Sequence, residues 1–134
     1  MKSKFPFKII SADGKVFTDN IDELYVTTKN GVIGILSGHF PLVAIVEISI
    51  IKIIKDNVVS YFSISGGVLN AEKDNAYILA DTFEKPSEID KERVLKSKHE
   101  AEEKLAKLSK EDVIAFKNAE FQLKKALNRI RLVK

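Results

Sequence analysis

The sequence predicts a mainly β protein with an added helical part: an antiparallel β-sandwich followed by a C-terminal hairpin of two antiparallel helices. Three observations support this prediction. Val, Ile and Thr number 25 in residues 1–84 but only 6 in residues 85–134, and all six glycines lie at or before Gly67. β-branched residues favour strands, whereas the Lys, Glu, Ala and Leu that replace them favour helix. The change falls near Pro86, so we expect a sandwich domain at residues 1–85 and a helical domain at residues 86–134.

The first domain is predicted to consist of many short strands. Phe5, Phe7 and Ile9 alternate with Lys4, Pro6 and Lys8, a period of two that buries one face. Further strands are predicted at Lys15–Thr18, Ile21–Thr28, Val32–Leu36, Leu42–Val46, Ile48–Lys55, Val58–Ser65, Val68–Ala71 and Ala76–Asp81. Turn residues separate these runs, and Asp13-Gly14 is a strong hairpin signal. We expect antiparallel pairing, because no crossover helix fits between the strands.

The second domain is predicted to form two helices. Ser87 can cap the first, with Asp90 three residues on, and Ser109 and Asp112 repeat this arrangement for the second. The link is expected around Leu108–Lys110. The apolar stripes are Val94, Ala101, Leu105 and Leu108 on the first helix, and Phe116, Ala119, Leu123, Leu127 and Ile130 on the second. The first stripe is narrow, so we expect the helical domain to dock weakly on the sandwich or to leave it for another surface.

Composition and charge exclude several classes of protein. The chain has no cysteine, so disulfides, thiol nucleophiles and zinc–thiolate sites are excluded. The longest apolar run, Leu42–Val46, is far too short to span a membrane, and the N-terminus does not resemble a signal peptide. The net charge of +3 divides into −2 for residues 1–84 and +5 for residues 85–134. Because the basic residues are interleaved with acidic ones, we expect no binding to nucleic acid.

The sequence offers little sign of catalysis. His39 and His99 lie in different domains and form no metal-ligand cluster, so no metal site is expected. No serine sits in a nucleophile elbow, and neither a Walker A loop nor a dinucleotide fingerprint occurs. We therefore expect that this chain alone is not an enzyme and needs no cofactor.

Two glycine-containing segments are more informative. One runs from Gly31 through Gly34-Ile-Leu-Ser-Gly38-His39-Phe-Pro41-Leu42, and the other is Ser65-Gly66-Gly67. Taken alone, each is a tight connection between strands. In this order, and followed by a helical hairpin, they resemble signatures of the epsilon subunits of F-type rotary ATP synthases. The resemblance covers essentially the whole chain, and Leu79-Ala80-Asp81 stands where that family closes its sandwich.

The resemblance implies a sandwich of about ten strands and a mobile helical pair. It implies a non-catalytic central-stalk subunit that binds the gamma subunit and the c-subunit ring, peripheral to the cytoplasmic face of the cell membrane. Extended along gamma into the catalytic alpha/beta head, the helices would oppose ATP hydrolysis. The implied contact loop for the ring and gamma comprises Gly31, Val32, Gly34, Gly38, His39 and Pro41. Val32 stands where an acidic residue is common in the family.

A second motif, Ile89-Asp90-Lys-Glu-Arg93-Val94, resembles an ATP-binding motif of some bacterial epsilon subunits. The resemblance implies a regulatory ATP site formed by Glu84, Ile89, Asp90, Arg93, Val94, Lys125 and Arg129. Val94 replaces a smaller alanine, and Lys125 replaces an arginine and its bidentate fork. From the residues alone, an N-terminal helix cap together with an intrahelical ion pair explains the same pattern.

Two other functions remain open at the level of sequence. One is a stand-alone β-sandwich module that senses nucleotides without a rotary partner. The other is an enzyme of unrecognised mechanism, whose turnover would depend on His39 or Asp90. A rotor subunit is distinguished from both by co-purification with gamma and a membrane-bound complex.

Overall fold

A computed structural model describes residues 3–109 and 111–133. The chain divides into two compact units, residues 1–85 and residues 86–134. Among the described residues, neither helix has the length and apolar character that a membrane crossing requires.

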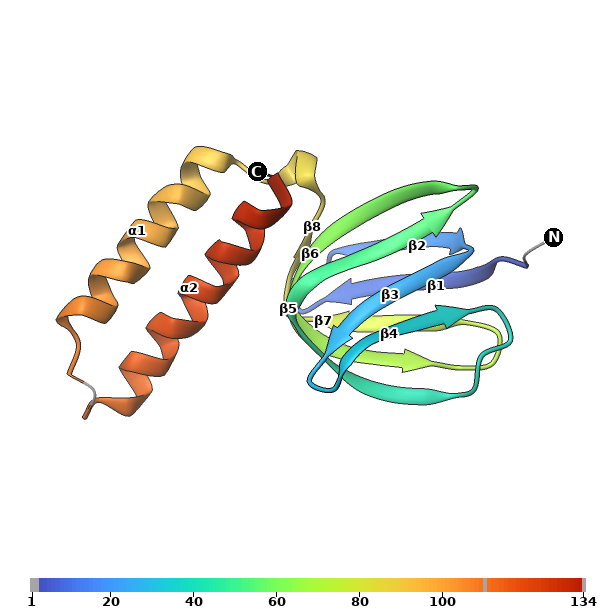
Figure 1. Ribbon diagram of the computed structural model, residues 1–134, viewed down its shortest axis with the longest axis horizontal. Helices are drawn as coiled ribbons and strands as arrows, with labels where there is room; N and C mark the ends of the chain where they lie inside the picture. The colour runs from blue at the N-terminus through green and yellow to red at the C-terminus, as the bar shows by residue number, and fades with distance from the viewer. Residues whose placement is uncertain (1–2, 110, 134) are drawn as a thin grey trace. The chain divides into compact units, whose positions relative to one another are not determined.

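The described residues of the first unit form eight strands in two layers (Figure 1). They are β1 (Phe5–Ser11), β2 (Val16–Ile21), β3 (Glu23–Thr28), β4 (Gly31–Leu36), β5 (Leu42–Lys55), β6 (Val58–Ala71), β7 (Ala76–Ala80) and β8 (Phe83–Glu84). Hydrogen bonding runs in the order β2-β1-β7-β6-β5-β3-β4, and β8 pairs with β6. The predicted β-sandwich is confirmed.

Two strands are longer than the sequence predicts. β5 and β6 are 14 residues each and pair in one register along their length, from Leu42 opposite Ala71 to Lys55 opposite Val58. Figure 1 shows both strands curving from one layer of the sandwich to the other. The sequence predicted a break in β5 at Glu47 and a break in β6 at Gly66-Gly67. In the structure, the pairing between the two strands continues past both places. Counting each half separately converts eight strands into the ten that the resemblance implies.

One pairing contradicts the sequence prediction. β1 and β7 are parallel, with Phe7 opposite Ala76 and Ser11 opposite Ala80. A parallel pair needs a long crossover connection, and we expected none because no helix fits between the strands. Here the connection between β1 and β7 is the chain of five intervening strands, which crosses through the other layer. The sandwich itself therefore supplies the crossover.

The core of the first unit is apolar and belongs to that unit alone. Its buried members run from Phe5 to Phe83, and Phe17, Ile33 and Leu42 pack against them. Aromatic rings are neighbours within it: Phe62 lies 4.8 Å from Phe17 and 6.0 Å from Phe83 between ring centroids. Side chains from every strand reach this core, as the alternating pattern of buried and exposed residues in β1 illustrates.

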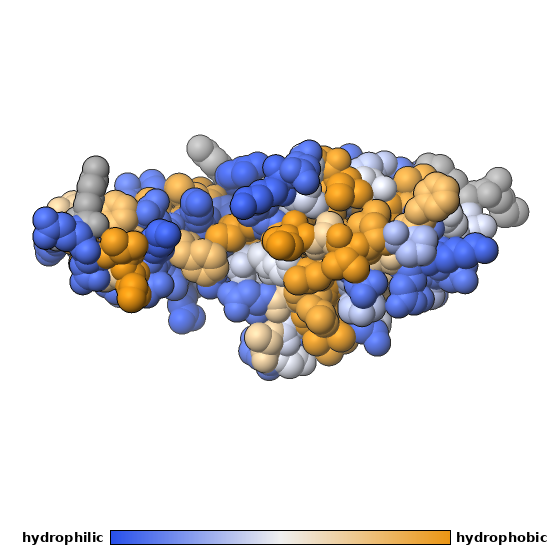
Figure 2. Space-filling view, turned by 90° about the horizontal axis from the view of Figure 1, so that it is seen from below, coloured by the Kyte–Doolittle hydropathy of each residue, from blue (hydrophilic) through white to orange (hydrophobic). Residues whose placement is uncertain are grey.

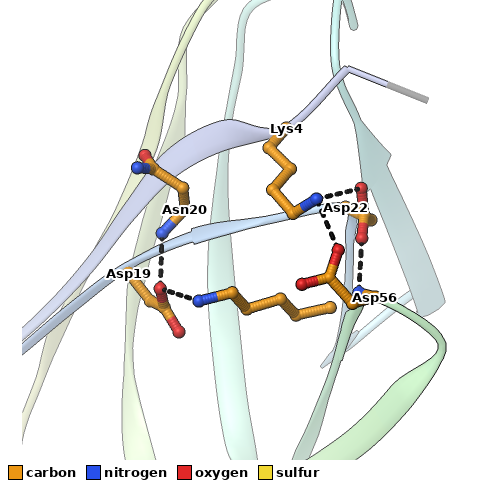
Figure 3. A network of polar contacts seen from close by, with 6 residues as sticks. Lys4, Asp19, Asn20, Asp22 and Asp56 are labelled. Carbon is orange, nitrogen blue, oxygen red and sulfur yellow. Dashed lines mark hydrogen bonds and ion pairs between the residues drawn. The ribbon is translucent and has the colours of Figure 1, made fainter. Parts of the chain in front are cut away.

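A polar network joins strands that are distant in the sequence (Figure 3). The Lys4 ammonium lies 2.6 Å from the Asp56 carboxylate and 3.8 Å from that of Asp22. Asp22 also accepts a hydrogen bond from the Asp56 backbone N–H at 2.8 Å. The Lys55 ammonium donates to Asp19 at 2.7 Å. These contacts connect the start of β1, the β2–β3 corner and the β5–β6 turn.

The second unit is a helical hairpin: a short 3-10 helix η1 (Pro86–Glu88), then α1 (Lys91–Lys107) and α2 (Val113–Val133). The two predicted caps are wrong by three residues. Ser87 lies in η1, and the carboxylate of Asp90 accepts from the Arg93 N–H at 3.2 Å as the N-cap of α1. Pro86 begins this separate turn, and the Ile89 N–H closes it by donating to the Pro86 carbonyl oxygen at 3.2 Å. The helix α1 therefore begins only after the turn.

The second helix repeats this shift. Asp112 precedes α2 and accepts from the Ala115 N–H at 3.3 Å, whereas Ser109 accepts from the Glu111 N–H in the linking turn. Within the predicted link, Lys110 lies outside the described residues. The buried apolar residues of the hairpin are Val94, Ala101, Ala119 and Ala126. Leu127, predicted to belong to the apolar stripe, is 41% exposed.

Candidate functional site

The first candidate site is the segment from Gly31 to Pro41. Gly31, Val32 and Gly34 belong to β4, an edge strand that pairs only with β3 among the described strands. The loop that follows turns back through the His39 N–H, which donates to the Leu36 carbonyl at 3.2 Å. Gly38 has a φ of 79°, which a residue with a side chain rarely adopts, so this turn requires glycine.

His39 holds the loop against the sandwich. Its ring meets that of the buried Phe5 edge to face, with centroids 5.8 Å apart. Its Nδ1 lies 3.2 Å from the carbonyl oxygen of Phe40, and its buried Nε2 has no hydrogen-bond partner among the described residues. This inward orientation suits an anchor of the loop. The neighbouring Phe40 points outward and is 88% exposed.

Large apolar side chains are exposed along β4, the loop after it and the start of β5. We call these residues the uncharged rim; they are Val32, Leu36, Phe40, Val43 and Ile45, with exposed fractions from 43% to 88%. Figure 2 shows apolar side chains gathered on the sandwich seen from below. Sequence reasoning selected Val32 but missed the other four. The signal for them was available, because residues 31–46 contain no Asp, Glu, Lys or Arg.

The Ser65-Gly66-Gly67 segment lies within β6, where Gly67 pairs with Ala80 of β7. A Cβ added to Gly67 would lie 2.3 Å from the Leu79 carbonyl oxygen. The Ser65 hydroxyl accepts from the Thr82 N–H at 2.9 Å. This segment therefore allows close approach of the backbones where the last strands meet.

The second candidate site is a groove within the helical hairpin, with a volume of about 860 Å³. It is lined by Ser97, Glu100, Ala101, Lys104 and Leu108 of the α1 side and by Ala115, Asn118, Ala119, Gln122, Lys125, Ala126 and Arg129 of α2. The lining carries three cations and one carboxylate, a net charge of +2, together with a hydroxyl and two amide side chains. Such a set suits an anionic ligand, since Arg and Lys donate charge-assisted hydrogen bonds to phosphate oxygens.

The structure brings together some of the residues predicted to bind ATP. Lys125 and Arg129 line the groove one turn apart, and the Lys125 ammonium also lies 4.7 Å from the centroid of the Phe121 ring. Ile89, Asp90, Arg93 and Val94 are not among the groove residues. Asp90 caps α1, and Val94 is buried. Glu84 lies in β8, in the other unit.

Sequence reasoning missed Ser97, Glu100 and Lys104. Successive steps of four, three and four residues lead from Arg93 to these three positions. This spacing places Arg93 and the three missed residues on one face of the helix. Within the described residues, no group of three or more His, Asp or Glu side chains is arranged to hold a metal ion.

Two family models match consecutive parts of the chain. The ATP synthase delta/epsilon chain β-sandwich domain matches residues 4–86, and the long α-helix domain of the same chain matches residues 87–134. The ATP synthase epsilon chain of Halalkalibacterium halodurans is 38% identical over 122 residues, 91% of each chain. That of Bacillus licheniformis is 39% identical over 123 residues, 91% of this chain and 92% of the relative.

Solved structures share the fold at lower identity. A chain of the Euglena gracilis mitochondrial ATP synthase (OSCP/F1/c-ring, rotational state 1) matches with a TM-score of 0.78 at 18% identity, covering 96% of this chain and 80% of that one. A chain of the Tetrahymena thermophila mitochondrial ATP synthase central stalk and c-ring matches with a TM-score of 0.56 at 15% identity. The match covers 98% of this chain and 95% of that one.

Proposed function

Because the chain belongs to the ATP synthase delta/epsilon chain family, we propose that it works as the epsilon-type rotor subunit of an F-type ATP synthase. It is a non-catalytic part of the central stalk and couples rotation of the proton-driven ring to ATP synthesis. One observation carries this function: two family models follow each other along the chain and meet within one residue of the boundary between its two compact units.

The partners of such a subunit are gamma, the c-subunit ring and the catalytic alpha/beta head. The sandwich is the part that binds gamma and the ring. The uncharged rim, with Gly38 and His39 shaping its loop, faces the ring. The subunit is held at the cytoplasmic face of the cell membrane by these partners.

The helical hairpin regulates ATP hydrolysis. Residues 85–134 carry a net charge of +5, and α2 alone has five basic residues against one acidic residue. A surface of this charge is attracted to acidic surfaces in the head, and attraction of this kind depends on ionic strength. Extended into the head, the hairpin opposes hydrolysis by occupying it.

Reconstitution tests this role. The full chain and a chain ending at residue 85 are each assembled with gamma and the catalytic head, and ATP hydrolysis is measured. We expect slower hydrolysis with the full chain than with the shortened one. Failure of the full chain to assemble with gamma would refute the rotor role. Equal hydrolysis rates with both assembled chains would refute only the regulation.

We further propose that ATP is a regulatory ligand of the hairpin. The groove supports this, because Lys104, Lys125 and Arg129 can hold phosphate oxygens while Asn118 and Gln122 offer amide donors and acceptors. ATP bound there favours whichever hairpin conformation forms the groove, since a ligand stabilises the state it binds. Calorimetric titration of the full chain with ATP tests this proposal, and absence of binding would refute it.

A stand-alone nucleotide sensor explains the groove but not the rest of the chain. The curated relatives match 91% of this chain and are ATP synthase epsilon chains. A sensor without a rotary partner would also leave the uncharged rim permanently exposed to water, at a cost in solubility. We therefore favour the rotor subunit, with ATP as its regulator.

A further inference from the structure

Asn30 lies in the turn between β3 and β4, and Gly31 follows it. The backbone nitrogen of the next residue can attack the side-chain carbonyl carbon of an asparagine, and glycine obstructs this attack least because it has no Cβ. We propose that Asn30 is a site of spontaneous deamidation, which converts this uncharged turn position into an anionic one as the protein ages. The chemistry depends on the local structure and is independent of the proposed function.

The reaction needs water as its only co-reactant. The Gly31 backbone nitrogen forms a bond to the Asn30 side-chain carbonyl carbon, and the bond from that carbon to the amide nitrogen breaks. This nitrogen leaves as ammonia, with the proton that Gly31 loses. The resulting five-membered cyclic imide adds water at either of its carbonyl carbons, and ring opening gives aspartate or isoaspartate. Both products carry a carboxylate where the amide was uncharged.

The hairpin leaves the reacting groups accessible. Asn30 and Gly31 are both exposed, and the Asn30 backbone N–H donates to the Thr28 hydroxyl at 3.2 Å. Within the part of the chain that the structure describes, the Asn30 side-chain amide has no hydrogen-bond partner. Apart from chain neighbours, no atom lies within 4 Å of the place where a Gly31 Cβ would stand. β4 pairs with β3 alone among the described strands, so opening this end of the hairpin costs little free energy.

The turn at Asp13-Gly14 has a related sequence but is protected. An aspartate closes the same imide only when its carboxyl group is protonated, because hydroxide is then not required to leave from a carboxylate. The Asp13 carboxylate accepts hydrogen bonds from the Ser11 hydroxyl and the Lys15 N–H. These bonds hold the pKa of Asp13 below its ordinary value and fix the side chain within its own turn. The structure therefore distinguishes the two turns, and only the one at Asn30 is open to the reaction.

The products change the hairpin in two ways. A carboxylate at residue 30 places a negative charge directly before residues 31–46, which contain no Asp, Glu, Lys or Arg. Isoaspartate also inserts a methylene group into the backbone, beside the pairing of Thr28 with Gly31 that closes the hairpin. We expect the modified chain to lose hydrogen-exchange protection along β4.

Ageing of the purified full chain in mildly alkaline buffer tests the proposal. Mass spectrometry of the intact chain and of its peptides follows the replacement of NH by oxygen, and enzymatic methylation detects isoaspartate. We expect the first mass gain at Asn30, and Asn30→Gln should abolish it because glutamine would have to close a six-membered ring. Asn57→Gln is the matched control and should leave the rate unchanged. Asn57 is also an exposed turn asparagine, but the branched Val58 follows it.

A chain unfolded in urea completes the comparison. There Asp13 loses its hydrogen bonds, so isoaspartate should form at Asp13 as well as at Asn30, whereas the folded chain should form it at Asn30 only. Three outcomes would overturn the proposal: an Asn30 that stays intact in the folded chain while it reacts in urea, a first mass gain at another asparagine, and an Asn30→Gln chain that ages like the unmodified one. Melting temperatures of both glutamine variants establish that they are folded.

Discussion

Gly67 shows how one residue can be fixed by a neighbouring backbone. The Cβ of an alanine there would lie 2.3 Å from the Leu79 carbonyl oxygen and 2.9 Å from the Ala80 Cα. Neither atom can move without disturbing the ladder between β6 and β7, in which Gly67 pairs with Ala80. The glycine of the Ser65-Gly66-Gly67 signature is therefore explained by packing and needs no ligand.

We predict that Gly67→Ala destabilises the sandwich by about 3 kcal/mol, because overpacking against backbone is costly. Gly34→Ala is the matched control. Its new Cβ would meet the edge of the Tyr25 ring at 2.9 Å, and a side chain can rotate away. Urea denaturation measures the free energy of unfolding that each variant loses relative to the unmodified chain. Equal losses for the two variants would show that the Leu79 contact is not the cause.

The Asp19–Lys55 pair gives the sandwich a pH dependence. The hydrogen bond from the Lys55 ammonium holds the pKa of Asp19 below its ordinary value, and the Asn20 N–H adds to this. A carboxyl group with a lowered pKa stabilises the fold above its ordinary pKa of about 3.9 and loses that contribution as pH falls through the folded value.

We therefore predict that Asp19→Asn lowers the free energy of unfolding by about 0.5 kcal/mol at neutral pH. The value is small because both side chains of the pair are partly exposed. The difference from the unmodified chain should shrink as the pH is lowered below about 4. Denaturation at several pH values measures it, with Lys55→Gln and the double variant completing a cycle. A difference that is constant with pH would exclude the ion pair as its origin.

At the level of elements, periodicity predicted most strands and both helices, because alternation and helical spacing are local. The failures have non-local causes. The parallel pairing of β1 with β7 depends on the path of the whole chain. The continuous course of β5 depends on its pairing with β6 past Glu47. Leu127 was assigned to the packed stripe, but Ala126 lets the helices approach more closely and is the buried one.

Asp90 is the clearest local error, and its role can be tested. We expect Asp90→Ala to lower the stability of α1 by about 1 kcal/mol, because the Arg93 N–H loses its acceptor. Hydrogen exchange at the first turn of α1 reports the loss. Asp90→Asn should restore protection, since asparagine also caps helices. If the asparagine variant frays as much as the alanine one, the cap is not the role of this side chain.

The candidate sites were predictable only in part, for a similar reason. Lys125 and Arg129 were implied by the family resemblance, and their one-turn spacing on one helix lets both face the same ligand. The contribution of Lys104 depends on how α1 faces α2, which the sequence does not show. The rim was recognisable from an absence of charge, but the sequence does not show that β4, which carries two of its residues, lies at a sheet edge.

The groove makes a prediction about ATP affinity. Arg129→Ala should weaken ATP binding at least about tenfold, or about 1.4 kcal/mol, by removing a charge-assisted donor. Lys117→Ala is the control, because Lys117 is an exposed cation of the same helix outside the groove. Calorimetry on both variants distinguishes a specific contact from general attraction to a basic helix. Equal weakening would indicate only the latter.

For the whole molecule, the division into two units determines how the parts can function. Every buried member of the main core lies between Phe5 and Phe83, so the sandwich does not depend on the hairpin for its interior. The hairpin buries mainly alanines and one valine, and small residues contribute little apolar area. A stable base with a weakly stabilised hairpin suits the proposed role, in which the sandwich stays bound to gamma while the hairpin binds the head reversibly.

This division predicts that a chain ending at residue 85 folds and binds gamma. Its core is complete, and its last strand, β8, still pairs with β6 through Ser63 opposite Glu84. We expect the circular dichroism of a β protein, a single cooperative thermal transition and retention on immobilised gamma. A chain ending at residue 81 is the informative comparison, because it loses β8 and the buried Phe83 and should melt at a lower temperature. Aggregation of the chain ending at residue 85, or its failure to bind gamma while the full chain binds, would contradict the independence of the sandwich.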